Sequence, residues 1–340
     1  MRRWILVLGG SLIVVLGSVA VLMAPHGDDQ PSWSTPPPGS RAEAARSGTL
    51  ARAYELRRAD DPPRTIVYDK GQPVATLTDG ARTVAFHGPP RTFVEASVSA
   101  KVVTDQWVRV APEPWSPKRA KDPEMSAWFH ASLGSTEPDI LQFTTEYLRG
   151  APPRRDDKGD LYAGDAGFGI ERGAGVDGAD FHEFMGIPWT FPDDTTVPAN
   201  PRWLGKLDCS GFLRIVYGYR GGLPLLTGTT RSTVDGMPRT ANAMAYYARS
   251  AVVAAGSSPE RAPRDLGDIQ PGDLVFFAMR DDPAKVSHSG IFLGVDVTGH
   301  PRFVSSRGVT RGPSFGDTAN SSSTLDDSAF SAALRRVIRL

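Results

Sequence analysis

The first hydrophobic pattern along the chain is an unbroken apolar run that extends from Trp4 to Met23 and follows two arginines. A run of about 20 apolar residues is long enough to cross a bilayer as a helix. We therefore expect residues 1–24 to be a signal peptide or a membrane anchor, and the rest of the chain to be exported. The choice between the two stays open, because Ser18-Val19-Ala20 resembles a cleavage site but the apolar run continues beyond it.

Short runs with strand-like spacing come next. Residues 25–62 are rich in proline and polar residues, which predicts a linker with a short helix. In residues 63–150 the apolar runs are separated by turn pairs such as Asp79-Gly80, and helical spacing follows from Thr136 to Gly150. We predict a small β-rich region ending in a helix, with strands at Thr65–Tyr68, Val84–Phe86 and Val102–Val110.

The C-terminal half changes from loops to helices and then to strands. Residues 151–203 are crowded with glycine, aspartate and proline, which predicts a loop-rich connector packed on the next domain. Helical spacing begins at Asp208, and a second helix is predicted at Pro238–Arg249. The strands expected after these helices are Asp273–Ala278, Ser287–Gly294 and Arg302–Ser306. Helices followed by an antiparallel sheet predict an α+β domain at residues 204–340.

The composition limits the classes of function. The chain has 340 residues and is 40% hydrophobic, which is enough apolar material for one or two packed domains. It has 38 basic and 38 acidic residues, so no net positive field attracts phosphate backbones, and nucleic acid is not an expected partner. A single cysteine in an exported chain forms no intramolecular disulfide, so Cys209 is either an inert buried thiol or a reactive one.

The position of Cys209 favours a reactive thiol. The sequence Asp208-Cys209-Ser210-Gly211-Phe212 places the thiol in the first turn of a predicted helix, with Asp208 as the N-cap. A helix N-terminus and a nearby imidazolium both lower the pKa of a thiol. We therefore expect a lowered pKa and a thiolate at Cys209.

His288 is the expected partner of this thiol. It is the only one of the six histidines at the start of an apolar strand, and alternation places His288, Gly290 and Phe292 on one face of the sheet. A helix packed on that face brings its N-terminal cysteine to the imidazole. A cysteine and a histidine in contact form the nucleophile and the base of acyl transfer.

Three blocks of the sequence resemble the NlpC-type cell-wall endopeptidases, which are papain-like cysteine peptidases. The blocks are Asp208-Cys209-Ser210-Gly211-Phe212, Gln270-Pro271-Gly272-Asp273-Leu274-Val275-Phe276-Phe277 and His288-Ser289-Gly290-Ile291-Phe292-Leu293-Gly294, in the order typical of that family. The resemblance covers residues 204–340 and implies a papain-like α+β domain whose catalytic helix packs on an antiparallel sheet. It implies that Cys209 is the nucleophile and His288 the base, and that the substrate is a peptidoglycan stem peptide cut next to a γ-D-glutamyl residue.

Further residues are assigned on the same resemblance. Members of the family usually carry a third polar residue on the strand after the histidine, and this chain offers Ser305, whose hydroxyl can accept the imidazole N–H. A loop hydroxyl or a backbone carbonyl in the same role stays open as the alternative. Asp208 and Ser210, which flank the nucleophile, are assigned to substrate binding, although N-capping alone also explains Asp208. The oxyanion hole is assigned to the backbone N–H of Cys209 and a second donor that the sequence does not identify.

Two other classes of function stay open. The same pair of residues serves an amidase or an acyltransferase, and a wall-binding protein with a decayed site is the non-catalytic alternative. No cofactor is expected, and no metal site, because the histidines are scattered without the spacing of a zinc cluster. The expected partners are peptidoglycan stem peptides, together with the membrane if the N-terminal segment is not cleaved.

Overall fold

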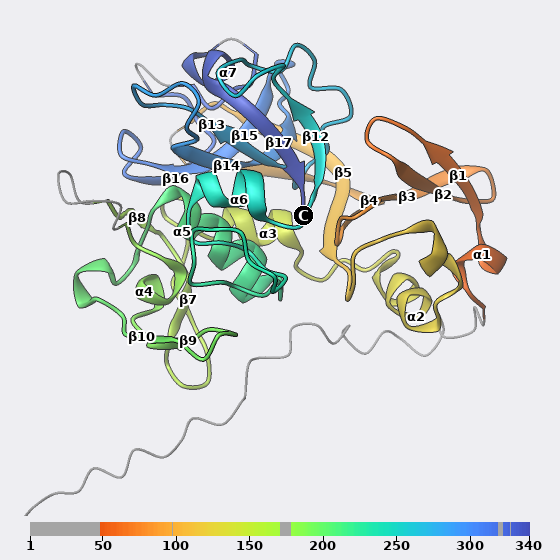
Figure 1. The fold of residues 1–340 in the computed structure, drawn as a ribbon, viewed down its shortest axis with the longest axis horizontal. Helices are drawn as coiled ribbons and strands as arrows, with labels where there is room; N and C mark the ends of the chain where they lie inside the picture. Colours follow the sequence, from red (N-terminus) through yellow and green to blue (C-terminus); the bar gives the residue numbers. More distant parts are fainter. Residues whose placement is uncertain (1–47, 97, 171–177, 319–321, 327) are drawn as a thin grey trace, which may run out of the picture. The chain divides into compact units, whose positions relative to one another are not determined.

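The β-rich region forms one antiparallel sheet whose five strands lie in sequence order (Figure 1). The structure is a computed structural model that describes residues 48–96, 98–170, 178–318, 322–326 and 328–340, all within one compact unit of the chain. The strands are β1 (Glu55–Ala59), β2 (Arg64–Asp69), β3 (Gln72–Thr78), β4 (Thr83–Val94) and β5 (Lys101–Val110). The predicted strands are confirmed, and the sheet begins inside the segment 25–62 that the sequence analysis interprets as a linker.

Two α-helices and a 3-10 helix pack on this sheet. They are α1 (Leu50–Ala53), η1 (Pro117–Lys121) and α2 (Pro123–Ser132). Asp122 caps α2 by accepting hydrogen bonds from the backbone N–H groups of Glu124 and Met125. Apolar side chains from the sheet and the helices then form a separate core, which includes Leu50, Val67, Leu77, Phe86, Trp115 and Phe129.

The predicted membrane segment, residues 1–24, lies outside the described residues. Within the part of the chain that the structure describes, no helix is long and apolar enough to cross a bilayer.

A short helix and small strands connect the two sheets. The predicted helix at Thr136–Gly150 is shorter than expected, since α3 spans Ile140–Thr145 and begins after the N-cap Asp139. The connector at residues 151–203 contains more regular structure than its composition indicates. Its elements are β6 (Arg154–Arg155), β7 (Leu161–Ala163), β8 (Gly167–Phe168), α4 (Phe181–Met185), β9 (Trp189–Thr190), β10 (Thr196–Val197) and the 3-10 helix η2 (Pro201–Trp203).

The C-terminal domain is built on a six-stranded antiparallel sheet with the order β12-β17-β13-β14-β15-β16 (Figure 1). Its strands are β12 (Ala251–Ala255), β13 (Leu274–Phe277), β14 (His288–Val295), β15 (Pro301–Arg307), β16 (Gly312–Ser314) and β17 (Leu334–Arg339). The helical elements are α5 (Cys209–Leu213), which continues into the π-helix η3 (Arg214–Arg220), α6 (Ala241–Tyr247) and α7 (Ala329–Ala333), and β11 (Lys206–Leu207) precedes α5. The predicted α+β class is confirmed.

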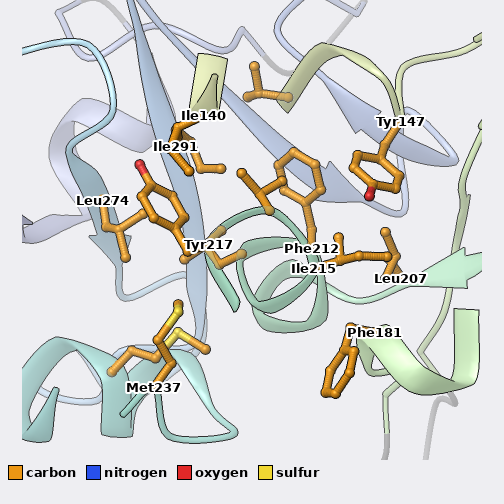
Figure 2. Close-up of a cluster of buried hydrophobic side chains, with 14 of the residues drawn as sticks. Ile140, Tyr147, Phe181, Leu207, Phe212, Ile215, Tyr217, Met237, Leu274 and Ile291 are labelled. Carbon is orange, nitrogen blue, oxygen red and sulfur yellow. The ribbon is translucent and has the colours of Figure 1, made fainter. Parts of the chain in front are cut away.

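Both faces of this sheet are buried. Leu274 and Phe276 of β13 pack in the larger core with Phe212 of α5, whereas Val275 and Phe277 pack in a second core with Phe330 of α7. Figure 2 shows Tyr217 beside Leu274 and Ile291 of the sheet, and Ile215 beside Leu207. Neighbouring residues of a strand point to opposite faces. The face that a side chain of β14 occupies therefore decides whether it meets α5 or α7.

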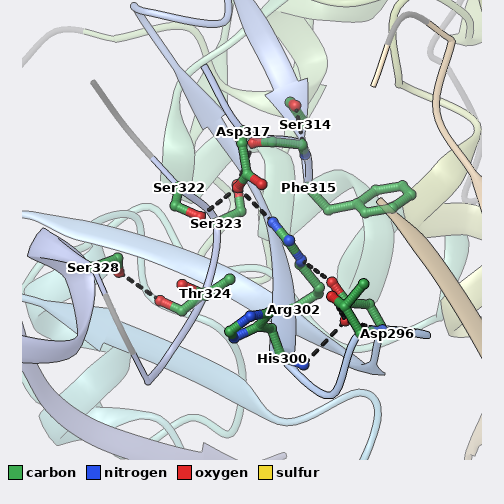
Figure 3. A network of polar contacts seen from close by, with 12 residues as sticks. Asp296, His300, Arg302, Ser314, Phe315, Asp317, Ser322, Ser323, Thr324 and Ser328 are labelled. Atoms are coloured by element: carbon green, nitrogen blue, oxygen red, sulfur yellow. Dashed lines mark hydrogen bonds and ion pairs between the residues drawn. The ribbon is translucent and has the colours of Figure 1, made fainter. Parts of the chain in front are cut away.

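Buried ion pairs and polar contacts hold the strands and loops of the domain. Asp273 accepts from the backbone N–H of Gln270 at 2.8 Å and also pairs with Arg339 of β17 at 2.7 Å. The turn between β14 and β15 is held by Asp296, which accepts from Arg302 at 2.7 Å (Figure 3). Arg302 also contacts Asp317 at 2.5 Å and thereby ties this turn to the segment that leads to α7.

Candidate active site

Cys209 lies at the first position of α5, as the sequence predicts. Asp208 is the N-cap, and its carboxylate accepts from the backbone N–H of Gly211 at 2.6 Å and from the Ser210 hydroxyl at 2.9 Å. Gly211 lets the helix approach the preceding loop, because a Cβ atom at this position would lie 2.3 Å from the carbonyl oxygen of Ala179. The local sequence thus fixes both the start of the helix and its close packing.

A partly buried arginine neutralises the N-cap carboxylate. Arg239 donates from Nη2 to Asp208 at 2.7 Å and to the Gly178 carbonyl at 2.6 Å, and from Nη1 to the Ser210 hydroxyl at 2.8 Å. Burial lowers the pKa of Arg239, but the charge of Asp208 and its other acidic neighbours outweighs burial and the net shift is upward. Arg239 therefore stays charged. Because Asp208 and Ser210 are already engaged in these contacts, their assignment to substrate binding stays a prediction.

A second buried pair lies next to the first. Arg214 is fully buried and donates from Nε to Asp180 at 2.9 Å, and Nε of Arg239 lies 3.6 Å from the same carboxylate. Asp180 also caps α4 in a capping box with Glu183. Burial raises the pKa of Asp180, but the two guanidinium groups lower it more and the net shift is downward. The network fixes α4, α5 and the loop before α6 to one another.

The surroundings of the Cys209 thiol do not favour ionisation. The residue is only 6% exposed, and burial followed by the negative charge of Asp208 raises the pKa of the thiol to about 11. The hydroxyl and the backbone N–H of Ser289, together with the charge of Arg239, lower this pKa, but they do not outweigh burial. The expectation of a lowered pKa is therefore wrong for this structure, because desolvation of a buried thiolate exceeds the effect of a short helix.

His288 occupies the opposite face of the sheet from the thiol. Its ring centroid lies 6.1 Å from that of Phe277 and 5.6 Å from that of Phe330, in the core beneath α7. Burial, followed by the charge of Arg307, lowers the pKa of His288 to about 3. Among the residues that the structure describes, His288 Nε2 has no hydrogen-bond partner.

The structure therefore does not bring Cys209 and His288 into contact. The sequence predicts that the helix after Asp208 packs on the face of the strand that carries His288, Gly290 and Phe292. In the structure α5 packs instead on the face that carries Ser289 and Ile291. Ser289 is the residue of β14 that lowers the pKa of the thiol. This is a correction to the predicted geometry, and its cause is that both faces of the strand are buried.

Ser305 lies on the same face of the sheet as His288. It is fully buried on β15, and a Cβ atom at Gly290 would lie 3.2 Å from its Cβ. No hydrogen bond between Ser305 and His288 is present within the described residues, and each side chain has a buried polar atom without a partner, Oγ and Nε2 respectively. The role of Ser305 as the residue that orients the imidazole stays a prediction.

The raised pKa of Cys209 predicts slow alkylation. Below the folded-state pKa of about 11 the thiol is neutral, so we expect iodoacetamide to label Cys209 more slowly than a model thiol at neutral pH. The labelling rate should rise steadily with pH through the usual thiol range instead of reaching a plateau there. Because the chain has one cysteine, mass spectrometry of intact protein at a series of pH values measures the rate directly. A plateau near neutral pH would show that the thiol is already ionised.

Arg239 is the residue that sequence reasoning missed. The sequence places it just before α6, far along the chain from Asp208, where an arginine reads as an ordinary surface residue. One feature of the sequence does indicate such a residue. Asp208 caps a helix that presents an apolar face, so its carboxylate is expected to be buried, and a buried carboxylate requires a cationic partner. The described residues hold no group of three or more His, Cys, Asp or Glu side chains placed to bind a metal.

Comparison with known families places this site in a recognised domain. Residues 195–315 match the model of the NlpC/P60 family. The resemblance to NlpC-type enzymes is confirmed. The match includes Cys209, Ser289 and His288, and it begins before the boundary at residue 204. It supports a cell-wall peptidase or hydrolase in general.

Three solved structures are similar to this chain at low identity. One is a Staphylococcus aureus subsp. aureus Mu50 protein similar to a lipoprotein of the NLP/P60 family, with 17% identity and a TM-score of 0.25, covering 66% of this chain and 54% of that one. The others are NlpC1 from Trichomonas vaginalis (12% identity, TM-score 0.25, covering 84% and 88%) and an NlpC/P60 family protein from Bacillus cereus ATCC 10987 (12%, 0.25, 84% and 79%). This chain thus spans about half of the S. aureus protein. No curated protein matches the sequence.

Proposed function

We propose that the NlpC/P60 segment is an exported cysteine endopeptidase that hydrolyses an amide bond in peptidoglycan stem peptides, next to a γ-D-glutamyl residue. The observation that carries the proposal is the single thiol of the chain at the N-terminus of α5, inside the segment that matches the family. A cysteine in this position is the nucleophile that acyl transfer by a thioester requires.

The proposed reaction has two steps. Cys209 Sγ attacks the carbonyl carbon of the scissile amide, the C–N bond breaks, and the leaving amine takes up the proton that the thiol has lost. Water then attacks the thioester, which releases the new carboxylate and regenerates the thiol. The backbone N–H of Cys209, at the start of α5, is a donor for the oxyanion that forms in both steps.

The base of this reaction is assigned to His288, and the assignment requires a change from the described arrangement. His288 is the first residue of β14 and follows a loop, so a change in the backbone at the strand end is sufficient to move its ring. The described state, with a neutral thiol and a neutral imidazole on opposite faces, is then a resting state. Substrate binding in this proposal provides the free energy that brings the two groups together.

Digestion of purified peptidoglycan tests the proposal. Mass spectrometry of the released fragments identifies the bond that is cut, and the expected products carry a new free carboxyl and a new free amine from an amide bond next to the γ-D-glutamyl residue. Cleavage between the sugar and the peptide would identify an amidase, and peptide exchange without hydrolysis would identify an acyltransferase.

A second function, wall binding without catalysis, is favoured by one observation. The predicted Cys209–His288 pair is not formed, and burial shifts the pKa of both groups away from the ionised pair. Sedimentation of the protein with intact peptidoglycan, with no fragments released over long incubation, would support this second function.

The proposed location is the cell-envelope side of the cytoplasmic membrane. It rests on the apolar run in residues 1–24. Because the described core begins at the fully buried Leu50, we expect a chain lacking residues 1–30 to stay folded and soluble. Circular dichroism and gel filtration measure this. If the truncated chain aggregates while the full-length chain is stable in detergent, the N-terminal segment is part of the fold.

A further inference from the structure

We infer that Ser289 is a positioning residue for the Cys209 nucleophile, and that its hydroxyl donates the hydrogen bond that the sulfur accepts when the thiol loses its proton. The inference rests on the proposed function and adds to it a residue that neither the family match nor the sequence analysis assigns. It starts from strand alternation, because β14 presents Ser289 to α5 and His288 to α7.

The first argument is the position of the hydroxyl. Ser289 is fully buried in β14 and lies opposite Phe276 of β13, which packs with Phe212 of α5, so its side chain is on the sheet face that meets α5. Within the described residues the Ser289 hydroxyl has no hydrogen-bond partner. In keeping with this position, the hydroxyl and the backbone N–H of Ser289 lower the pKa of the Cys209 thiol. A buried hydroxyl without a hydrogen-bond partner lowers the stability of the fold by about 1–3 kcal/mol. Such a group in a native structure calls for an explanation, and a role at the active site provides one. Its proton is available to the sulfur.

A neighbouring buried serine has no hydroxyl proton left to donate. Ser306 of β15 is also fully buried and faces α5, but its hydroxyl donates to the Leu207 carbonyl at 2.7 Å. That proton is therefore already in use. Of these two buried serines on the sheet face that meets α5, Ser289 is the one whose hydroxyl has no hydrogen-bond partner among the described residues.

The charges around the thiol explain why a neutral donor is suited to this place. Asp208 opposes ionisation of Cys209 and Arg239 favours it, and the two are paired with each other at 2.7 Å. Their effects on the sulfur therefore partly cancel. An O–H donor stabilises a thiolate without bringing a further charge into the buried site, where an unpaired charge is costly.

Alkylation of the single cysteine tests the inference without any measurement of catalysis. At about pH 8 the rate is proportional to the thiolate fraction, so loss of one hydrogen bond to the sulfur in Ser289→Ala should reduce the rate about tenfold. Ser306→Ala is the matched control and should react at the parent rate, because the proton of its hydroxyl is already donated to the Leu207 carbonyl. Circular dichroism checks that both variants are folded.

A second pair of variants separates the hydroxyl from the shape of the side chain. Ser289→Thr keeps the O–H and Ser289→Val replaces it with a methyl group of the same size, so Thr should react faster than Val by a similar factor. Equal rates for Thr and Val, or equal effects of Ser289→Ala and Ser306→Ala, would overturn the inference. Absence of peptidoglycan hydrolysis by the parent protein would instead overturn the proposed function and leave the alkylation result valid.

Discussion

Cys209→Ala is expected to abolish the release of fragments from purified peptidoglycan while the protein stays folded. The substitution removes the only thiol of the chain, so no covalent intermediate can form at this position. The cost in stability should be small, because the alanine keeps the Cβ and the cap at Asp208 is unchanged. Quantitative mass spectrometry of released fragments, with thermal unfolding of the same sample, measures both effects. Persistent hydrolysis would require another nucleophile.

His288→Ala should reduce the same activity about 10²–10⁴-fold, because general-base catalysis contributes roughly 3–5 kcal/mol to a barrier of this kind. His300 offers a matched control. It lies in the turn between β14 and β15, is exposed, and contacts Asp326 at 2.8 Å, so His300→Ala should leave hydrolysis unchanged. If His288→Ala is as active as the parent, His288 never reaches the nucleophile and the described arrangement is also the catalytic one.

The start of α5 was predictable because local chemistry determines it. An aspartate followed by a helical apolar pattern caps a helix wherever the chain is placed, and Asp208 does so here. The strands β13, β14 and β15 were predictable for a similar reason, since continuous apolar runs bounded by turns indicate buried strands. These elements place Cys209 and His288 on neighbouring parts of the domain, and that much followed from the sequence.

The face of β14 that meets α5 was not predictable. Every residue from Ser289 to Gly294 is buried, so the strand has no polar face to identify the side that points away from a core. The choice depends on the rest of the sheet, where α7 and its Phe330 cover one face and α5 covers the other. The error of one position along the strand exchanged His288 for Ser289 at the thiol.

The strand β17 was missed because its sequence lacks a strand pattern. β17 contains three arginines, yet it lies between β12 and β13 within the sheet. Arg339 is accommodated there because it pairs with Asp273 at 2.7 Å and donates to Thr78 of the first sheet at 2.7 Å. Such pairing between segments far apart in the chain has no local signal.

Arg239→Gln is expected to lower the free energy of unfolding by about 3–5 kcal/mol, because it leaves the buried carboxylate of Asp208 without its cation. Arg249→Gln is the matched control. Arg249 lies 3.7 Å from Asp235 in an exposed pair, so its loss should cost less than about 1 kcal/mol. Urea denaturation of the parent and both variants measures the difference, and equal costs would contradict the structural role of Arg239.

The double variant Asp208→Asn with Arg239→Gln decides whether charge is the cause. Asparagine is also a good N-cap, so α5 keeps its cap while both members of the ion pair become neutral. The double variant should therefore be more stable than Arg239→Gln alone, and its cost should be well below the sum of the two single substitutions. Additive costs would show that the geometry of the guanidinium and its bonds to Ser210 and Gly178, and not the neutralisation of Asp208, hold the start of the helix in place.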